Sequence, residues 1–587
     1  MAIAHSEVSG PNRSDIHGHE EQHGHGHPTG FLSKYIFSFD HKVIGIQYLL
    51  LAMVMSLVGV GLSVVFRIQL AWPGTAGMTP ETYVSYVTMH GTIMIFFVVS
   101  LALSSGLGNY TIPLQVGARD MAYPLLNMLS FWIVLVGAVI MTASFFVEGG
   151  AAAGGWTAYP PLSALSGFGK VPKGAPGSGM GQTLWLLAMA LFIVSFTMGG
   201  LNYVATVLNL RARGMSLMRM PLTVWTWFVA ALLGLLSFPA LTAAAIMLLL
   251  DRHAGTSFFL PTGLVVSGQQ AANIGGTPLL FQHLFWFLGH PEVYVLVLPA
   301  LGIAFDVIAC FARRPVHGYR TSVYSLCLIA FLGMIVWGHH MFTSGMNPWL
   351  GKYFSITTLL ITAPFAVLGV NLVASLWRAR IRFATPMLFA LGLISAVGTG
   401  GIGGLFLATA TADLHFHDTY FVVGHFHLMI GVVTMTGTFA GVYYWFPKMF
   451  GRMMNETLGK LHFWGTMVGV MTVFTLQHFQ GLGGMTRRYF EYSAEYVKPA
   501  TALNPVITWF AFIAVAAQVL FFVNFFWSVF FGKKCSANPW EGTTLEWTTV
   551  TPPPHGNWER LPVVSGDPYG YAHGEDGNAY RMQNAEA

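Results

Sequence analysis

The sequence predicts an all-α polytopic membrane protein with twelve transmembrane helices in one bundle. Of its 587 residues, 54% are hydrophobic and only 9% are charged, whereas soluble proteins carry about 25% charged residues. The mean hydropathy is +0.59, and apolar runs of the roughly 20 residues needed to cross a bilayer recur along the chain. A soluble fold is therefore excluded. The small net charge of +5 does not imply nucleic-acid binding.

Twelve spans are expected at 43–68, 84–108, 124–146, 182–209, 222–250, 281–311, 321–343, 353–376, 382–407, 419–446, 459–479 and 504–531. They make one helical bundle over 43–531, between a polar tail at 1–42 and a second tail at 532–587. The first tail is rich in histidine, a composition that can bind metal but need not fold. The second tail contains three consecutive prolines and several aromatic residues, which indicates an extended segment that packs on the bundle or on a partner.

Basic side chains gather in the loops on one side of the predicted bundle. These loops hold Arg211, Arg213, Arg219, Arg313, Arg314, Arg320, Arg378, Arg380, Arg382, Lys448, Arg452 and Lys460. The positive-inside rule places that side in the cytoplasm, and an even number of spans puts both termini there. The first 42 residues lack the features of a cleaved signal, so we expect the first span to be an uncleaved anchor.

Six histidines lie in otherwise apolar stretches of four predicted helices: His90, His290, His339, His340, His425 and His427. An imidazole in hydrocarbon is costly unless it is hydrogen-bonded, paired or bound to a metal. Because successive helices alternate in direction, each histidine can be assigned a depth, and all six fall in the outer half of the bilayer. A lone buried histidine is more often a hydrogen-bonded core residue, but six at one depth indicate a shared layer of cofactors.

Helical geometry divides the six histidines into sets. His425 and His427 diverge by about 200° around their helix, so they cannot serve one centre. A helix wedged between two cofactors would use them on opposite faces, with His90 as a further ligand of one cofactor. His290, His339 and His340 remain as three imidazoles with an open coordination position, which suits copper, although zinc fits the ligand type as well.

Two further residues near His290 point to chemistry. Tyr294 follows one turn later on the same helix face, and a phenol beside a copper site can donate a proton and an electron. Glu292 is a carboxylate within a span that points elsewhere on the helix. Such a group commonly marks a proton relay, and a structural hydrogen bond is the alternative.

Four motifs around these residues make the chain resemble subunit I of the haem-copper terminal oxidases, the A-type oxygen reductases that include cytochrome c oxidase. They are Thr-Met-His-Gly at 88–91, His-Pro-Glu-Val-Tyr at 290–294, Trp-Gly-His-His at 337–340 and His-Asp-Thr-Tyr-Phe-Val-Val-Gly-His-Phe-His at 417–427. The resemblance covers all twelve predicted spans. It implies an enzyme that encloses two haems of the a type and one copper, reduces O2 to water with electrons from cytochrome c, and pumps protons.

The resemblance also implies roles for the metal-binding residues. His90 and His427 would be axial ligands of a low-spin haem, and His425 the proximal ligand of a high-spin haem. His290, His339 and His340 would bind the copper, with Tyr294 covalently linked to His290.

At the outer side, the resemblance implies contacts that support these cofactors. His417 and Asp418 would contribute to a magnesium site. Arg487 and Arg488 match an arginine pair that holds haem propionates, since a guanidinium donates bidentately to a carboxylate. Trp156 matches a neighbour of that pair, and Arg67 matches an arginine that contacts the low-spin haem.

For protons, the resemblance implies one complete route and one missing route. Asp120 matches the entrance of the main proton channel and Glu292 its inner end. The matching polar lining consists of Asn109, Asn127 and Asn202. A second route in the family ends at a lysine in span eight, but here Phe365 and Leu368 replace the threonine and the lysine. We therefore expect the second route to be absent or rerouted.

The implied partners are a subunit II with a dinuclear copper, a subunit III and cytochrome c, in the plasma membrane of a bacterium. A quinol oxidase of the same family is the alternative, but Thr82 and Ser85 stand where quinol oxidases carry a polar cluster with His and Gln. Nitric oxide reductases lack the tyrosine that Tyr294 provides. A twelve-span secondary transporter would explain the hydropathy but not six histidines at one depth.

Overall fold

The computed structural model describes residues 30–165, 179–266, 268–271, 274–571 and 580–585. The chain divides into two units, Met1–Ser38 and Phe39–Ala587. In the first unit, the described residues contain a short π-helix, η2 (Leu32–Ile36). The predicted histidine-rich stretch from His17 to His27 lies outside the described residues.

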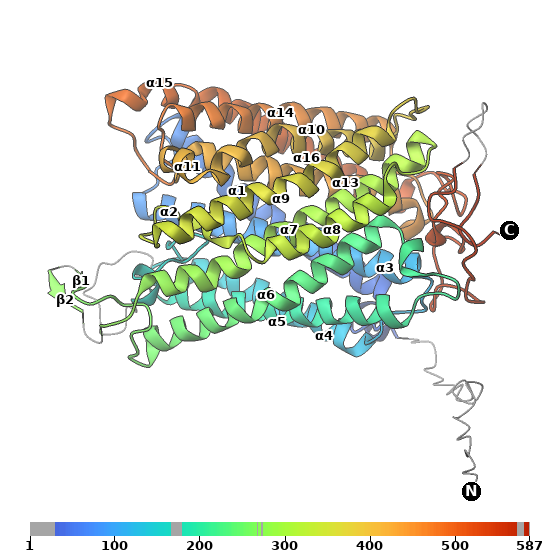
Figure 1. Cartoon of the computed structure of the whole chain (residues 1–587), viewed down its shortest axis with the longest axis horizontal. Coiled ribbons are helices and arrows are strands. Elements are labelled where there is room, and N and C mark those ends of the chain that lie inside the picture. Colours follow the sequence, from blue (N-terminus) through green and yellow to red (C-terminus); the bar gives the residue numbers. More distant parts are fainter. Residues whose placement is uncertain (1–29, 166–178, 267, 272–273, 572–579, 586–587) are drawn as a thin grey trace, which may run out of the picture. The chain divides into compact units, whose positions relative to one another are not determined.

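The second unit is a bundle of long helices that run alongside one another (Figure 1). In its first half these are α1 (His41–Ala71), α2 (Pro80–Thr92), the π-helix η3 (Ile93–Leu107), α3 (Gly108–Val116), α4 (Pro124–Ala143), α5 (Met180–Asn209), α6 (Leu222–His253) and α7 (Pro278–Ala312). The second half contains α8 (Tyr319–Gly333), the 3-10 helix η7 (Trp337–Met341), α9 (Pro348–Ser375), α10 (Thr385–Ala408), α11 (Ala410–Phe416), α12 (Tyr420–Phe426), the π-helix η8 (His427–Val432), α13 (Val433–Phe450), α14 (Glu456–Leu482), α15 (Lys498–Thr501) and α16 (Asn504–Phe531). One small hairpin, β1 (Val265–Val266) with β2 (Gln269–Gln270), lies in the α6–α7 connection.

Ten helical segments of the described chain are long and apolar enough to cross a membrane. The predicted all-α polytopic fold is therefore confirmed, but composition supports only ten of the twelve predicted spans. The two others are α8 and α14. α8 has only 15 residues and is followed by the 3-10 turn η7, whereas α14 has 27 residues and is long enough but not apolar enough. Predicted span seven is shorter than expected because α8 ends at Gly333. His339 and His340 follow in the 3-10 turn η7.

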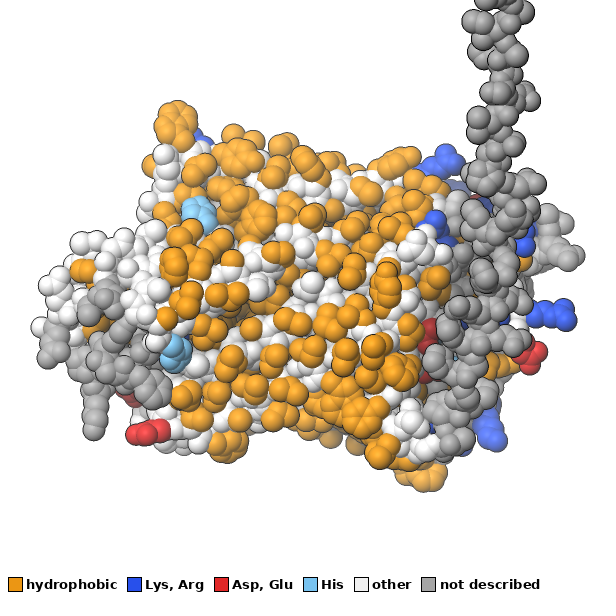
Figure 2. Space-filling model, turned by 90° about the horizontal axis from the view of Figure 1, so that it is seen from below, with side chains coloured by type: hydrophobic (Ala, Val, Ile, Leu, Met, Phe, Trp, Pro, Cys, Tyr) orange, Lys and Arg blue, Asp and Glu red, His pale blue; other side chains and the backbone are white. Residues whose placement is uncertain are grey.

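The surface of the bundle has the polarity of a membrane protein. Figure 2 shows hydrophobic side chains over the middle of the visible face and most of the visible Lys and Arg at one end. Exposed apolar residues of the bundle include Leu57, Val139, Leu236, Ile402, Val468 and Val519. Apolar side chains facing outward are stable only where hydrocarbon replaces water.

The C-terminal tail, residues 532–571, packs against one end of the bundle, which we call the tail end; the opposite end is the far end. The basic loops meet the tail there: Arg213 pairs with Val563 in a β-bridge, and Arg452 pairs with Lys534. Arg313 and Arg382 both bind Glu541, at 2.7 and 2.9 Å. The loops that carry the predicted positive charge therefore share one end of the bundle with this tail.

Two of the long helical segments change their winding near the predicted site. The helix from Pro80 to Val116 contains η3, and the helix from Tyr420 to Phe450 contains η8, whose first residue is His427. A π-helical stretch widens the turn, rotates the residues that follow, and occurs frequently at functional sites.

Close packing of α14 against α12 holds the helix that carries His425 and His427. A Cβ atom on Gly481 would lie 2.0 Å from the backbone nitrogen of Phe421, so only glycine fits there.

We therefore predict that Gly481→Ala displaces α12 and costs about 1–3 kcal/mol of stability, as overpacking does. Thermal unfolding of the purified protein measures this loss. Gly61→Ala in α1 is the matched control, because nothing lies within 4 Å of its added Cβ. Equal melting temperatures for the two variants would contradict the prediction.

Candidate functional site

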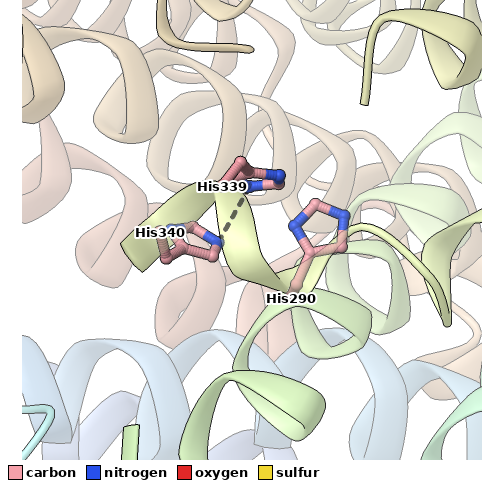
Figure 3. Close-up of side chains that lie close together, drawn as sticks. All are labelled: His290, His339 and His340. Atoms are coloured by element: carbon pink, nitrogen blue, oxygen red, sulfur yellow. Dashed lines mark hydrogen bonds between the residues drawn. The ribbon is translucent and has the colours of Figure 1, made fainter. Parts of the chain in front are cut away.

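Three imidazoles from two neighbouring segments meet in the core of the bundle. His290 lies on α7, and His339 and His340 lie on the 3-10 helix η7 (Figure 3). One ligand nitrogen of each histidine lies within 4.8 Å of the others. The Nε2 atoms of His339 and His340 are 3.1 Å apart. The predicted set of three imidazoles is thus one cluster in space.

The surroundings of the cluster fit a metal ion. Both ring nitrogens of His290 are buried without a hydrogen-bond partner, which is costly unless a ligand satisfies them. The Nδ1 of His339 lies 2.9 Å from the Thr358 hydroxyl, and the ring of His340 stacks on Trp286 at 3.7 Å. Such neighbours orient imidazole ligands, and three imidazoles suit copper.

Tyr294 lies beside this cluster on α7. Its ring centroid is 5.0 Å from that of His290. Gly333 leaves the necessary room, because a Cβ there would lie 3.1 Å from the tyrosine ring. Glu292 is buried, receives a 3.4 Å hydrogen bond from the Ser100 hydroxyl, and keeps one carboxylate oxygen without a partner.

His90 and His427 face each other across a second position. Their rings are nearly parallel, with an interplanar angle of 17° and centroids 6.5 Å apart. The Nδ1 of His90 donates to the carbonyl of Gly59 at 2.8 Å, and that of His427 donates to Val423 at 2.9 Å. Since a carbonyl only accepts, each Nδ1 carries the hydrogen and each Nε2 keeps its lone pair for a metal.

His425 points to α10, away from His427. Its Nδ1 lies 2.8 Å from the carbonyl of Gly400, which again leaves Nε2 as the ligand atom. Glycines line α10 beside it, and a Cβ on Gly404 would lie 3.0 Å from the His425 ring. The glycines therefore let the His425 ring lie against α10.

The loop after α4 covers the cluster from the far end. Trp156 packs on Gly91, where a Cβ would lie 3.2 Å from it, and its ring is 5.7 Å from that of Trp286. This loop thus places an aromatic side chain next to the site.

The two arginines of the far end lie next to Trp156. A Cβ on Gly155 would lie 3.4 Å from Nη1 of Arg488, and burial together with the adjacent Arg487 charge lowers the pKa of Arg488 to about 10. Arg487 binds Asp418 at 2.6 Å. Burial would raise the pKa of Asp418, but the charges of Arg487 and His417 outweigh it and lower that pKa.

His417 has a partner that motif reading did not identify. Its Nδ1 lies 2.8 Å from Asp413, which is buried, while its Nε2 lies 4.0 Å from Asp418. A carboxylate on Nδ1 orients a histidine for a ligand on Nε2. Asp413 precedes His417 by one helical turn, and this spacing was the available signal.

Arg67 is buried between α1 and α16. It donates to Thr508 at 3.0 Å and to the carbonyl of Asn504 at 3.1 Å, and its Nη1 has no partner. One buried nitrogen of this guanidinium thus remains without a partner within the described chain.

The sequence matches the family described as cytochrome c and quinol oxidase polypeptide I over residues 43–513. It is 48% identical over 551 residues to the alternative cytochrome c oxidase subunit 1 of Bradyrhizobium diazoefficiens, covering 93% of this chain and 92% of that protein. It is 43% identical to the cytochrome c oxidase subunit 1 of Synechocystis, covering 93% and 94%. The subunit from Cereibacter sphaeroides is 38% identical, with 92% and 97% covered.

The chain belongs to this family. A solved heme-copper terminal oxidase dimer has the same fold, with a TM-score of 0.66 over 84% of this chain and 85% of that chain, at 18% identity. Membership of this oxidase family implies haem and copper in the complete protein. The donor set at His290, His339 and His340 is consistent with that implication.

Asp120 of this oxidase subunit lies in the loop between α3 and α4, at the tail end. Its carboxylate accepts from the amide of Met121 at 2.7 Å. Burial, reinforced by the charge of Asp40, raises its pKa to about 7. Asn202 holds the loop in place, since its side chain bonds both the amide and the carbonyl of Tyr123, at 2.9 and 3.1 Å.

A polar track continues from this loop into the bundle. Asn127 is fully buried and both of its amide atoms lack partners, as does Oδ1 of Asn109. Asn109 also lines a partly open cavity of about 40 Å³, large enough to hold water. The polar residues lining it are Tyr48, Ser104, Ser105, Asn109, Ser195 and Tyr203.

The hydroxyl groups of this track were missed by motif reading. The hydroxyl of Tyr48 lies 2.9 Å from that of Ser130, and the Ser100 hydroxyl bonds Glu292. Hydroxyl residues within predicted spans were the available signal. The spacing of these residues did not distinguish hydroxyl groups that line a polar track from hydroxyl groups that only bond the backbone of their own helix.

At the two positions that the resemblance assigns to the second route, the side chains are apolar. Leu368 is fully buried and Phe365 packs against the same core. On α7, the residues that follow Tyr294 toward the tail end include the buried Leu298, Leu301 and Phe305. The side chain at position 368 therefore cannot transfer a proton as a lysine would.

The raised pKa of Asp120 predicts how pH affects stability. Because the pKa is about 7 in the fold, against 3.8 ordinarily, the folded protein keeps a proton that the unfolded chain loses, and stability falls as pH rises through this window. The Asp120→Asn variant has no carboxyl at this position, so its stability does not fall with pH for this reason. The melting temperature of the variant, relative to the parent, should therefore rise between about pH 4 and pH 7 and stay level above it. Parallel curves would contradict the assignment.

Proposed function

We propose that this chain is the catalytic subunit of a respiratory terminal oxidase that reduces O2 to water with electrons from cytochrome c and couples the reaction to proton pumping. The observation that carries the proposal is the three-imidazole cluster beside Tyr294, in the same core as His425 and the facing pair of His90 and His427. The family and the named relatives support it.

In this proposal the residues divide as their geometry suggests. His90 and His427 hold a low-spin haem, His425 holds a high-spin haem, and His290, His339 and His340 hold copper. When bound, the haem irons and the copper carry the electrons that reduce O2. We assign both haems to the a type. Arg487 and Arg488 hold haem propionates, with Trp156 beside them. Arg67 contacts the low-spin haem, and His417 with Asp418 binds magnesium.

The chain's own groups handle the protons. Tyr294 donates a proton, and an electron, next to the copper site. Glu292 is the inner end of the proton route, because it is buried, meets Ser100 and keeps a carboxylate oxygen without a partner. Protons reach it from Asp120 through Asn109, Asn127, Asn202 and the cavity that Asn109 lines. With apolar residues at Phe365 and Leu368, this one route serves both the chemistry and the pumping.

We further propose that the tail end faces the cytoplasm of a bacterium, with both termini on that side. The basic loops gather there, as the positive-inside rule requires. Electrons then arrive at the far end, from a subunit II that carries a dinuclear copper and docks cytochrome c. A subunit III completes the complex within the membrane.

Cytochrome c is the proposed donor because the positions typical of quinol binding have local structural roles. The hydroxyl of Thr82 pairs with Thr79 at 3.1 Å, at the start of α2, and Ser85 donates to the carbonyl of Ala151 at 3.2 Å.

Steady-state O2 consumption by the purified complex should therefore proceed with reduced cytochrome c and not with ubiquinol. Turnover with quinol alone would identify a quinol oxidase. A purified complex without haem bands in its visible spectrum would overturn the oxidase assignment altogether.

Metal analysis tests the copper assignment. His290→Asn should lower the copper content relative to haem and abolish turnover, because the cluster loses one of three ligands, while the spectrum of the low-spin haem remains. His317→Asn, on the exposed surface of the tail end, is the control and should match the parent. Full copper content in His290→Asn would contradict the assignment.

The proton route has its own prediction. Asp120→Asn should slow turnover by roughly 10²-fold, as expected when a proton-transfer group is removed, and should stop pumping in reconstituted vesicles. Because no second route is expected, anaerobic reduction of the high-spin haem should slow as well. Asp567→Asn, an exposed carboxylate in the tail, is the control. Normal pumping in Asp120→Asn would show that protons enter elsewhere.

A further inference from the structure

Asn557, in the C-terminal tail, is buried at the tail end with all of its side-chain hydrogen-bonding groups engaged. Its Oδ1 accepts from the Lys42 ammonium at 2.8 Å, and its Nδ2 donates to the carbonyl of Ala118 at 2.8 Å. Its Nδ2 also lies 2.9 Å from Nε2 of His41. The residue is fully buried and its backbone is left-handed, with φ at 67°.

Hydrogen-bond chemistry assigns each donor in this group. The Nδ1 of His41 lies 2.7 Å from the carbonyl of Asn109, so Nδ1 must carry the hydrogen, because a carbonyl only accepts. In the neutral ring Nε2 is then an acceptor and takes the second hydrogen of the Asn557 amide. One amide thus links the carbonyl of Ala118 directly, and that of Asn109 through His41.

Both linked carbonyls belong to residues in or next to the proposed proton route. Ala118 precedes Asp120 by two residues, and the side chain of Asn109 lines the cavity that leads inward. The tail also packs on the same loop through apolar contacts. A Cβ on Gly117 would lie 3.1 Å from Pro562 and 3.2 Å from Leu545, so the loop fits against the tail without spare room.

Charged groups of the tail and of the start of α1 surround Asp120 as well. His555 lies 3.2 Å from Asp40, and Asp40 lies 2.9 Å from Lys42. The charge of Asp40 raises the pKa of Asp120, whereas those of Lys42 and His555 lower it. A displacement of the tail would therefore change the electrostatics of the carboxylate as well as its position.

We propose that Asn557 is a positioning residue for proton uptake: through Ala118 and His41 it holds Asp120 and Asn109 in register, so that the C-terminal tail is part of the proton entrance. This inference rests on the proposed role of Asp120. Asn557 transfers no proton itself.

Two substitutions in the complete oxidase complex, reconstituted in vesicles, test the proposal. Asn557→Gly removes the amide but tolerates the left-handed backbone. Asn557→Asp keeps the size and the acceptor for Lys42 but cannot donate to Ala118 or His41. Both variants should lower kcat about tenfold, the effect of a stabilising contribution of one or two hydrogen bonds.

The readouts separate positioning from general damage to the fold. The KM for reduced cytochrome c and the rate of low-spin haem reduction should stay at parent values, while proton uptake from the tail side, followed with a pH dye after a single turnover, should slow. Glu541→Ala is the matched control, because it removes the tail's ion pairs to Arg313 and Arg382 away from Asp120. Its proton uptake should equal that of the parent.

The results distinguish this inference from the function it rests on. If Asp120→Asn turns over normally, the proposed proton route is wrong. If Asp120 is essential but Asn557→Gly and Asn557→Asp take up protons at the parent rate, only the positioning role is overturned. Should the glycine variant fail to assemble, the aspartate variant decides. Adding Asn557→Gly to Asp120→Asn should cause no further slowing, and an additive loss would contradict action through Asp120.

Discussion

Every imidazole buried in this bundle needs partners for its two ring nitrogens, and the rest of the site depends on this requirement. His90, His425 and His427 each satisfy Nδ1 with a backbone carbonyl, which fixes the tautomer and leaves Nε2 as a ligand atom. His290 has no partner at either nitrogen. These buried ring nitrogens are therefore available as ligand atoms. The metals proposed here would offset the free-energy cost of burying them without a partner.

The packing around this layer is shaped to leave room. Glycines occur where other side chains would intrude, at Gly404 beside His425 and at Gly91 beneath Trp156. The π-helical stretch that begins at His427 and the 3-10 turn at His339 break the regular helix where the ligands sit. Regular α-helices would present these side chains at other angles, so local irregularity brings the ligands together.

The two ends of the bundle carry different groups. The far end carries Trp156 and the arginine pair over the metal layer, whereas the tail end carries the basic loops, the Asp120 loop and the C-terminal tail. Asp120 is half-buried near the charges of Asp40, Lys42 and His555, and small movements at that end would alter its protonation. Under the proposed function, access of protons depends on these tail contacts.

The sequence by itself determined the membrane class, most spans and the divergence of His425 from His427, because hydrophobic runs and helical periodicity are local properties. Tertiary structure alone decided the shortening of α8, the partnership of Asp413 with His417, the hydroxyl track through Tyr48 and Ser130, and the contact of Asn557 with the Asp120 loop. These features depend on which helices pack together. A buried polar group finds its partner across a helix interface, and residue spacing within one helix does not specify that neighbour.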